Sequence, residues 1–211
     1  MLKPLFSFLF LFCLSQVYSQ KLISEEIWNK WDPDILARAN TALNVDYMSG
    51  EEKLVVLLTN LARTDGLLFS ETFLNAYLEG IETNKYSKSL YKDLKSVRNL
   101  PLLYPEKDLF EAALGHAEKS GKSGHVGHEG FDARFKPLMK KYNNVAENCA
   151  YGYEKAIDIT IQLLIDEDVP SLGHRLNMLN PEYNSIGVSI QPHKEYQFNC
   201  VMDFGRIATE R

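Results

Sequence analysis

The sequence predicts an α+β fold in which helices pack around a small, mainly antiparallel sheet. Apolar residues recur at helical spacing in several separate stretches, whereas strand-like runs are few and fall in the C-terminal third, at 147–151, 185–190 and 196–204. The last two runs are joined by five residues and predict a hairpin. Strands and helices do not alternate regularly, so a parallel βαβ sheet is not expected.

Two helix starts are marked in the first third of the chain. An aspartate–proline pair at 32–33 places a capping side chain before proline at the first helical position, and predicts a helix continuing over 35–43. The Ser-Gly-Glu-Glu segment at 49–52 is a capping box that leads into a helix over 53–63. Apolar residues cover most of that helix, which predicts deep burial, and the Asp-Gly pair at 65–66 is expected to end it.

Four further helices are expected. Ser70 is positioned to cap a helix that continues to about residue 80, and the segment 105–121 opens with proline and ends with glycine. The segment 155–166 is amphipathic. Ser171 is expected to cap a short helix that ends before Pro181.

The N-terminus has the pattern of a cleaved export signal. Lys3 precedes an apolar run over 5–14, and the small residues before Gln20 favour cleavage there, so residues 1–19 are predicted to be a signal peptide. A retained N-terminal anchor is the alternative. The run is shorter than the roughly 20 apolar residues of a membrane span, and no later stretch reaches that length.

The residues that follow divide into two parts. The segment 20–47 is predicted to be a helical extension that docks on the domain, because it contains two tryptophans and is too apolar for a free tail. The segment 48–211 has the length of one domain. After cleavage the chain holds 22 basic and 28 acidic residues, which argues against a nucleic-acid partner.

Two cysteines remain in the exported chain, Cys149 and Cys200. They lie in the first and last predicted strands, so adjacent strands would bring them within bridging distance, and export permits a disulfide. The alternative is two separate buried thiols, which behave as small apolar side chains.

Three short segments carry residues able to bind a metal or move a proton. His125 lies in a glycine-rich loop three residues before His128, Glu147 begins a predicted strand, and His174 falls in the first turn of the helix expected after Ser171. The helix dipole disfavours a charged imidazole at that position, which keeps a lone pair free on His174. Each also has a structural interpretation: His125 exposed to solvent, Glu147 at a wet edge, and His174 sharing cap hydrogen bonds.

The acidic turn at 166–168 ends the helix before this segment, where solvation is the ordinary outcome. Asp166 or Glu167 can alternatively supply a second carboxylate beside His174. The sequence lacks a zinc-protease H-E-x-x-H segment and a G-x-S-x-G nucleophile elbow.

The order of these segments, G-H, A-E-N, G-H-R and I-G-V, resembles the CAP superfamily (cysteine-rich secretory proteins, antigen 5 and pathogenesis-related-1; SCP-like extracellular domains) over residues 48–207. The resemblance implies a three-layer α-β-α sandwich. It also implies an open cleft that holds zinc or another divalent cation, with the ligands His125, Glu147, His174, and either Asp166 or Glu167. Leu163-Leu164 departs from the family, which commonly has tryptophan there, and the cysteine-rich tail of some members is missing.

The CAP superfamily has no single settled activity. The resemblance therefore implies a secreted interaction module, non-catalytic or weakly catalytic, whose partner is an extracellular protein, a lipid or a small molecule. Two alternatives stay open. One is a metal-dependent hydrolase in which Glu147 acts as base on a metal-bound water. The other is an extracellular lipid or sterol carrier with a groove lined by apolar residues of 68–104.

Overall fold

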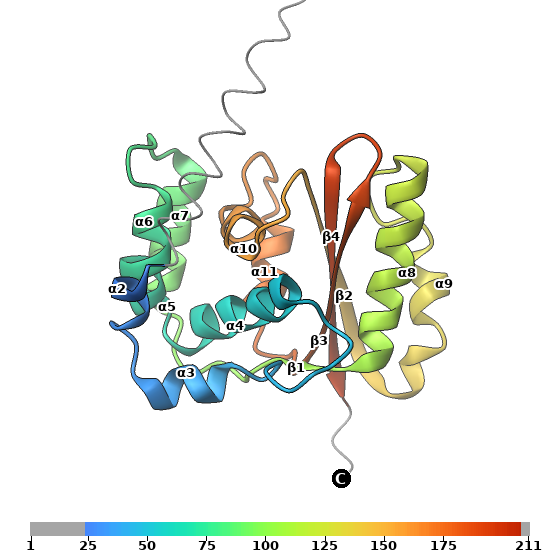
Figure 1. Ribbon diagram of the computed structural model, residues 1–211, viewed down its shortest axis with the longest axis horizontal. Helices are drawn as coiled ribbons and strands as arrows, with labels where there is room; N and C mark the ends of the chain where they lie inside the picture. The colour runs from blue at the N-terminus through green and yellow to red at the C-terminus, as the bar shows by residue number, and fades with distance from the viewer. Residues whose placement is uncertain (1–23, 208–211) are drawn as a thin grey trace, which may run out of the picture.

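The computed structural model describes residues 24–207, which form three layers with a four-stranded sheet in the middle (Figure 1). The strand order is β1 (Tyr104–Pro105), β3 (Ser185–His193), β4 (Gln197–Ile207) and β2 (Tyr142–Tyr151). The short β1 pairs parallel with β3, whereas β3 pairs antiparallel with β4 and β4 with β2. The predicted fold class, an α+β sandwich with a mainly antiparallel sheet, is confirmed, and β2 is an edge strand.

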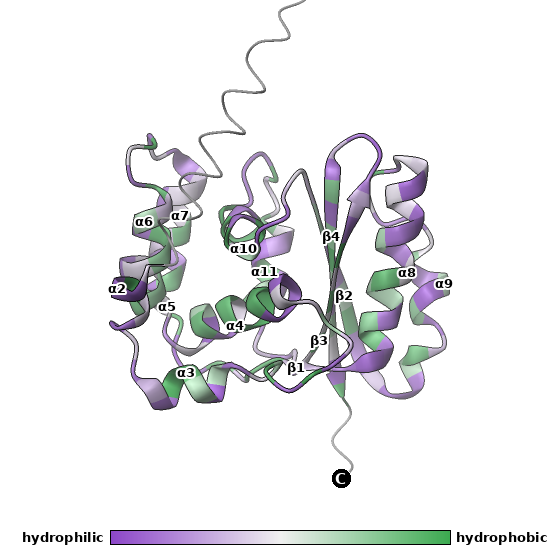
Figure 2. Cartoon of the chain, in the orientation of Figure 1, coloured by the Kyte–Doolittle hydropathy of each residue, from purple (hydrophilic) through white to green (hydrophobic). Residues whose placement is uncertain are grey.

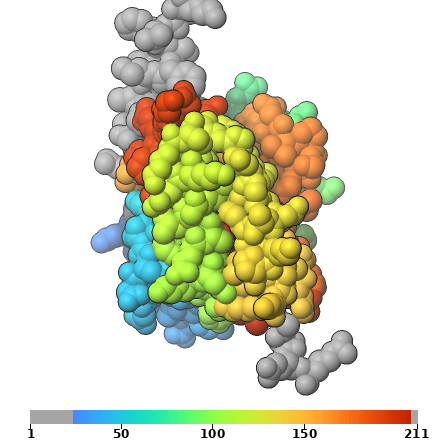
Figure 3. Space-filling view, turned by 90° about the vertical axis from the view of Figure 1, so that its right-hand side faces the viewer, coloured from blue at the N-terminus to red at the C-terminus, as the bar shows by residue number. Residues whose placement is uncertain are grey.

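One outer layer consists of α8 (Lys107–Ser123), α9 (Phe131–Phe135) and a 3-10 turn, η2 (Leu138–Lys140). Figure 3 shows α8 and α9 side by side on this surface. The helix α8 lies very close to the sheet, because a Cβ on Gly187 of β3 would come within 2.2 Å of the backbone at Leu109. Glycine at position 187 is therefore required for the two layers to pack.

The other layer contains the remaining helices of residues 24–207. Next to the sheet lie α4 (Gly50–Thr64), α10 (Ala156–Ile165) and α11 (Gly173–Met178). Farther out lie α2 (Glu25–Trp28), α3 (Pro33–Ala39), α5 (Gly66–Phe69), the π-helix η1 (Ser70–Leu74), α6 (Asn75–Tyr77) and α7 (Lys85–Leu94). No helix within residues 24–207 is long and apolar enough to cross a membrane.

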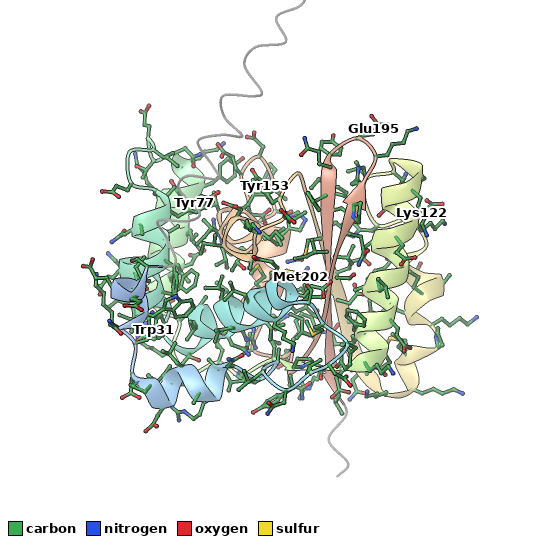
Figure 4. The ribbon with its side chains drawn as sticks, viewed as in Figure 1. Trp31, Tyr77, Lys122, Tyr153, Glu195 and Met202 are labelled. Atoms are coloured by element: carbon green, nitrogen blue, oxygen red, sulfur yellow. The ribbon has the colours of Figure 1, made fainter. Side chains whose placement is uncertain are left out.

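The main core fills the space between the sheet and α4 and α10. Figure 2 shows hydrophobic residues concentrated on these two helices and hydrophilic residues over much of α8 and α9. In Figure 4 Met202 of β4 lies on the side of the sheet that faces α4, and it is fully buried. The predicted capping box of α4 is present: Ser49 Oγ accepts a hydrogen bond from the Glu52 backbone, and the Glu52 carboxylate accepts one from the Ser49 backbone at 2.6 Å.

The prediction that Ser70 caps a helix is wrong. That helical segment begins after Asp65, whose side chain accepts a hydrogen bond from the Leu68 backbone, and it runs without a break through α5, η1 and α6. The helix α4 ends at Thr64, as the Asp65–Gly66 pair predicts, and Gly66 also begins α5. Glycine is required at position 66, because a Cβ there would lie 2.5 Å from the Leu94 carbonyl oxygen. The helix α7 was not predicted, although Asn84 and Ser87 form a capping box at its start.

The segment before α4 contributes directly to the main core. Trp31 is 3% exposed, lies beside Phe73 and donates from its indole nitrogen to the Thr72 hydroxyl at 3.3 Å. Figure 4 shows Trp31 near the short α2, on the side of the helical layer away from the sheet. Ala39 and Ala42 are buried in the same cluster. The predicted signal peptide, residues 1–19, lies outside the described residues.

The prediction of a Cys149–Cys200 disulfide is wrong, and both thiols are free and buried. Cys149 lies opposite Val201, and Cys200 lies opposite Ala150, so the two cysteines are offset by one residue on paired strands. Neighbouring residues along a strand point to opposite faces of the sheet. Cys149 accordingly packs under α8, whereas Cys200 belongs to the main core on the other face.

We expect both thiols to be chemically free. Protein starting at Gln20 should gain two alkyl adducts when it is unfolded in denaturant and alkylated without reductant, because no backbone shift compatible with the sheet turns both side chains to one face. Intact mass measurement checks this. A chain two mass units lighter than the reduced form, with no adduct, would show that the pairing of β2 with β4 is not as described.

Candidate functional site

Two imidazole–carboxylate pairs are the chief polar feature near the edge strand β2. His128 Nδ1 lies 2.8 Å from Glu147 Oε1, and His174 Nδ1 lies 2.6 Å from Asp166 Oδ1. Both carboxylates are 1% exposed, whereas the side chains of His128 and His174 are 48% and 24% exposed. Each pair therefore consists of a buried acid that holds a partly exposed ring.

Glu147 lies in β2 on the face covered by α8 and α9. Its second oxygen, Oε2, accepts a hydrogen bond from Arg134 of α9. Burial raises the pKa of Glu147, but the hydrogen bonds from His128 and Arg134 and the charge of Arg134 outweigh burial and hold the pKa below its usual range. Glu147 is therefore a carboxylate at neutral pH.

Asp203 of β4 lies directly opposite Glu147 in the antiparallel pair, and its side chain is on the same face. It is fully buried, and neither of its oxygens has a conventional hydrogen-bond partner among the described residues. Burial and then the neighbouring Glu147 raise the pKa of Asp203 well above its usual range. The neutral form of Asp203 is therefore favoured relative to that of an exposed aspartate.

The loop after α8 presents His128. Gly124, which ends α8, and Gly127 have positive φ angles of 77° and 109°, conformations that other residues adopt at a cost. Both backbone polar groups of Gly127 have partners. Its N–H donates to the Tyr151 hydroxyl at 2.8 Å, and its carbonyl lies 2.8 Å from His116 Nε2.

The same loop contacts the tip of the β3–β4 hairpin. His193 Nε2 lies 3.0 Å from the His125 carbonyl oxygen, and the Lys194 N–H donates to the Gly121 carbonyl at 2.9 Å. Figure 4 shows Glu195 on the hairpin and Lys122 on α8 at the same end of the molecule. The loop conformation is thus set by contacts with the sheet and α8.

Asp166 positions His174 and also begins α11. Its backbone has φ 57°, which ends α10. One carboxylate oxygen holds the His174 ring, and the other accepts hydrogen bonds from the backbone N–H groups of His174 and Arg175 at 2.9 and 3.3 Å. The prediction that Ser171 caps this helix is wrong, because Leu172 precedes α11 and the Asp166 side chain satisfies its first N–H groups.

Asn148 connects the two pairs. It follows Glu147 in β2, is fully buried, and donates from its side-chain amide to the His174 carbonyl oxygen at 3.0 Å. Asn177 of α11 donates in turn to the Asn148 side-chain oxygen at 2.8 Å. Consecutive residues of the edge strand therefore contact the two histidine segments from opposite faces of the sheet: Glu147 holds the His128 ring, and Asn148 holds the backbone of His174.

The family profile described as the cysteine-rich secretory protein family (CAP) matches residues 58–204, a span that contains all four residues of the two pairs. The chain belongs to the CAP family. No curated protein matches the chain.

Several solved structures are similar to this CAP domain. An extracellular protein containing an SCP domain from Bacillus anthracis is 23% identical, with 51% of this chain and 35% of that chain covered and a TM-score of 0.42. An outer surface protein from Borrelia burgdorferi is 24% identical, with 61% and 97% covered and a TM-score of 0.45. A cysteine-rich secretory protein from Staphylococcus aureus is 12% identical, with 75% and 40% covered and a TM-score of 0.44. The chain thus spans about a third of the Bacillus anthracis chain.

Three of the five predicted ligands, Glu147, His174 and Asp166, belong to the two pairs of this CAP domain. His125 does not: its side chain is 43% exposed, and its nearest charged partner is Glu129, 3.9 Å away. The loop turns at Gly127, so the ring that reaches Glu147 is that of His128. Glu167 lies next to Asp166 but accepts a hydrogen bond from Asn84 of the outer helical layer at 2.6 Å.

Sequence reasoning missed several residues of this site. His128 was noted only as half of an H-x-x-H spacing, and that spacing gives no reason to prefer either histidine. Arg134 and Asn148 carry no local signal for their roles. Asp203 had such a signal, because it is the single polar residue in the otherwise apolar run 200–204. A buried acid in an apolar strand is costly and calls for a partner.

Proposed function

We propose that this protein is an exported CAP-domain binding protein that holds a divalent cation, zinc being the best match, between the Nε2 atoms of His128 and His174. One observation carries the proposal. In both rings Nδ1 is held by a buried carboxylate, and no described residue bonds to either Nε2. Metal-ligating histidines characteristically donate their second ring N–H to a carboxylate, which fixes the tautomer and the orientation of the ring.

The acids have supporting roles in this proposal. Glu147 and Asp166 orient the imidazoles and keep the lone pair on Nε2, and a bound cation would offer its remaining positions to water or to an oxygen ligand of the partner. Arg134 and the N–H groups of α11 hold the two carboxylates in turn. The site is therefore built from rigid elements, which favours a preformed binding position.

Ligand binding is favoured over hydrolysis by the state of Glu147. Each of its oxygens already accepts a hydrogen bond, one from His128 and one from Arg134. A general base needs a free oxygen within hydrogen-bond reach of the water that it deprotonates. Both oxygens of Glu147 are engaged and its side chain is 1% exposed, so it does not face a solvent water, and we propose an interaction module without hydrolytic activity.

Export is part of the proposal. The pattern of residues 1–19 is that of a signal peptide, and the partner is accordingly sought outside the cell or in a periplasm, among proteins, lipids or small molecules. The intact mass of protein recovered from the exported fraction tests this directly. A chain starting at Gln20 is expected, whereas a chain that keeps residues 1–19 would contradict export by cleavage.

Zinc titration by calorimetry tests the site. Metal-stripped parent protein should bind zinc near neutral pH, and His128→Ala or His174→Ala should abolish binding at the cleft, because each removes one of two nitrogen ligands. Asp166→Asn should weaken binding about 10- to 100-fold. His125→Ala is the matched control, a histidine of the same loop, and should leave the affinity unchanged. Equal loss with His125→Ala, or no binding by the parent, would contradict the proposal.

A further inference from the structure

Beneath His128 lies a second group of metal-binding atoms, contributed by α8 and β2. The ligand atoms of His116, Glu147 and Cys149 all lie within 4.8 Å of one another, and all three residues are buried. His116 Nε2 is 3.8 Å from Glu147 Oε1, and Cys149 Sγ is 3.6 Å from His128 Nδ1. Neighbouring ligand atoms around a tetrahedral zinc ion lie roughly 3.3 to 3.6 Å apart, given Zn–N and Zn–S distances of about 2.0 and 2.3 Å.

Asp203 provides an independent observation at the same place. Its buried carboxyl lacks a conventional hydrogen-bond partner among the described residues, and it lies directly across from Glu147. A buried polar group without partners is costly unless something in the structure compensates for it. A cation bound at Glu147 Oε1 would attract the oxygens of the Asp203 carboxyl group, while Arg134 continues to donate to Glu147 Oε2.

We propose that His116, Glu147 and Cys149 form a buried site for a thiolate-binding divalent cation of the zinc type, whose fourth position is left to water, while His128 Nδ1 keeps its hydrogen bond to Glu147. Thiolate and imidazole ligands in a tetrahedral set select zinc over magnesium or calcium. This site goes beyond the proposed cleft site and uses neither His174 nor Asp166. Entry is past the His128 ring, which is half exposed and covers the buried atoms.

Loading has to displace two hydrogen bonds to the Gly127 carbonyl. The Gly127 carbonyl lies 2.8 Å from His116 Nε2 and 3.8 Å from Cys149 Sγ, so it accepts the hydrogen bonds that these groups would exchange for the metal. Gly127 has open space around the position of a Cβ, which leaves room for the loop to move. On loading, the Cys149 thiol loses its proton to solvent and becomes the thiolate ligand. His116 only changes tautomer, so one cation displaces one proton.

Cobalt(II) is the probe, because it occupies zinc sites and gives a thiolate-to-cobalt charge-transfer band in the near ultraviolet only when cysteine is a ligand. The reduced chain starting at Gln20 should develop this band with one equivalent of cobalt. Cys149→Ala should abolish the band, and His116→Gln should raise the cobalt concentration needed to saturate it. Cys200→Ala is the matched control, a buried thiol one register away on the opposite face, and should keep the band.

His174→Ala separates this proposal from the cleft site. Both sites are supported if His174→Ala keeps the cobalt band but binds one equivalent of zinc fewer than the parent in the calorimetric titration. No band in the parent, or a band that persists in Cys149→Ala, overturns the buried site. If the buried site is overturned but zinc binding still depends on His174, only the site of the proposed function is supported. If the band is present but zinc binding is unchanged in His174→Ala, only the buried site is supported.

Discussion

Replacing Arg63 by methionine should destabilise the protein by about 4 kcal/mol or more, which is enough to prevent folding of many domains. Arg63 in α4 is fully buried, and its guanidinium donates only to backbone carbonyls, those of Pro101, Met178, Asn180 and Tyr183. Methionine fills similar space but donates nothing, so four carbonyls lose a partner at about 1–3 kcal/mol each, less what relaxation recovers.

Burial lowers the pKa of Arg63 to about 10, so the guanidinium is still charged at neutral pH. Arg98→Met is the matched control. Arg98 is 40% exposed and meets Asp65 at 3.4 Å, so its loss should cost at most about 1 kcal/mol. Urea unfolding followed by circular dichroism compares the two variants. A similar loss of unfolding free energy in both variants would show that Arg63 does not anchor the segment between α11 and β3 to the helix α4.

Removing the segment before Tyr47 should have the other large effect. The described part of this segment places Ile27, Trp31, Ala39 and Ala42 in the main core, and a chain starting at Tyr47 would expose the surfaces that they cover. Trp31→Ala alone should cost about 3–5 kcal/mol, because a large indole leaves a cavity beside Phe73. For a chain of this length that corresponds to a fall in Tm of about 10 °C.

Leu43→Ala is the control for the extension. Leu43 lies in the same segment but is 62% exposed, and its truncation should change stability by no more than about 0.5 kcal/mol. Thermal unfolding of the parent, the two point variants and the shortened chain gives the comparison. An unchanged Tm in the shortened chain would mean that the extension contributes nothing to the stability of the domain.

The sequence predicted well those features that depend on short-range hydrogen bonds. The capping box at Ser49 and the cap at Asp32 involve residues two or three positions apart, and both are present in the structure. Prediction failed where the deciding partner is distant or unusual. The sequence predicts a cap at Ser70, but the helical segment already begins after Asp65. It predicts a cap at Ser171, but the carboxylate of Asp166 reaches α11 across the intervening loop.

The candidate site shows the same division. Glu147 and His174 could be proposed from their local segments, but the choice between His125 and His128 depends on how the loop turns at Gly127. That turn is fixed by Tyr151 and His116, which lie elsewhere in the sequence. The disulfide prediction failed because the sequence does not reveal strand register, and a shift of one residue turns Cys149 and Cys200 to opposite faces.

Asp166 performs three tasks with one carboxyl group: it follows the last turn of α10, satisfies the first N–H groups of α11 and holds the His174 ring. Any screen of random variants for ligand affinity at His174 is therefore also a screen for an intact α11. Glutamate is one methylene longer and asparagine carries no charge, so neither replacement meets all three demands. Improvements in binding at His174 therefore have to come from the residues around Asp166 and not from Asp166 itself.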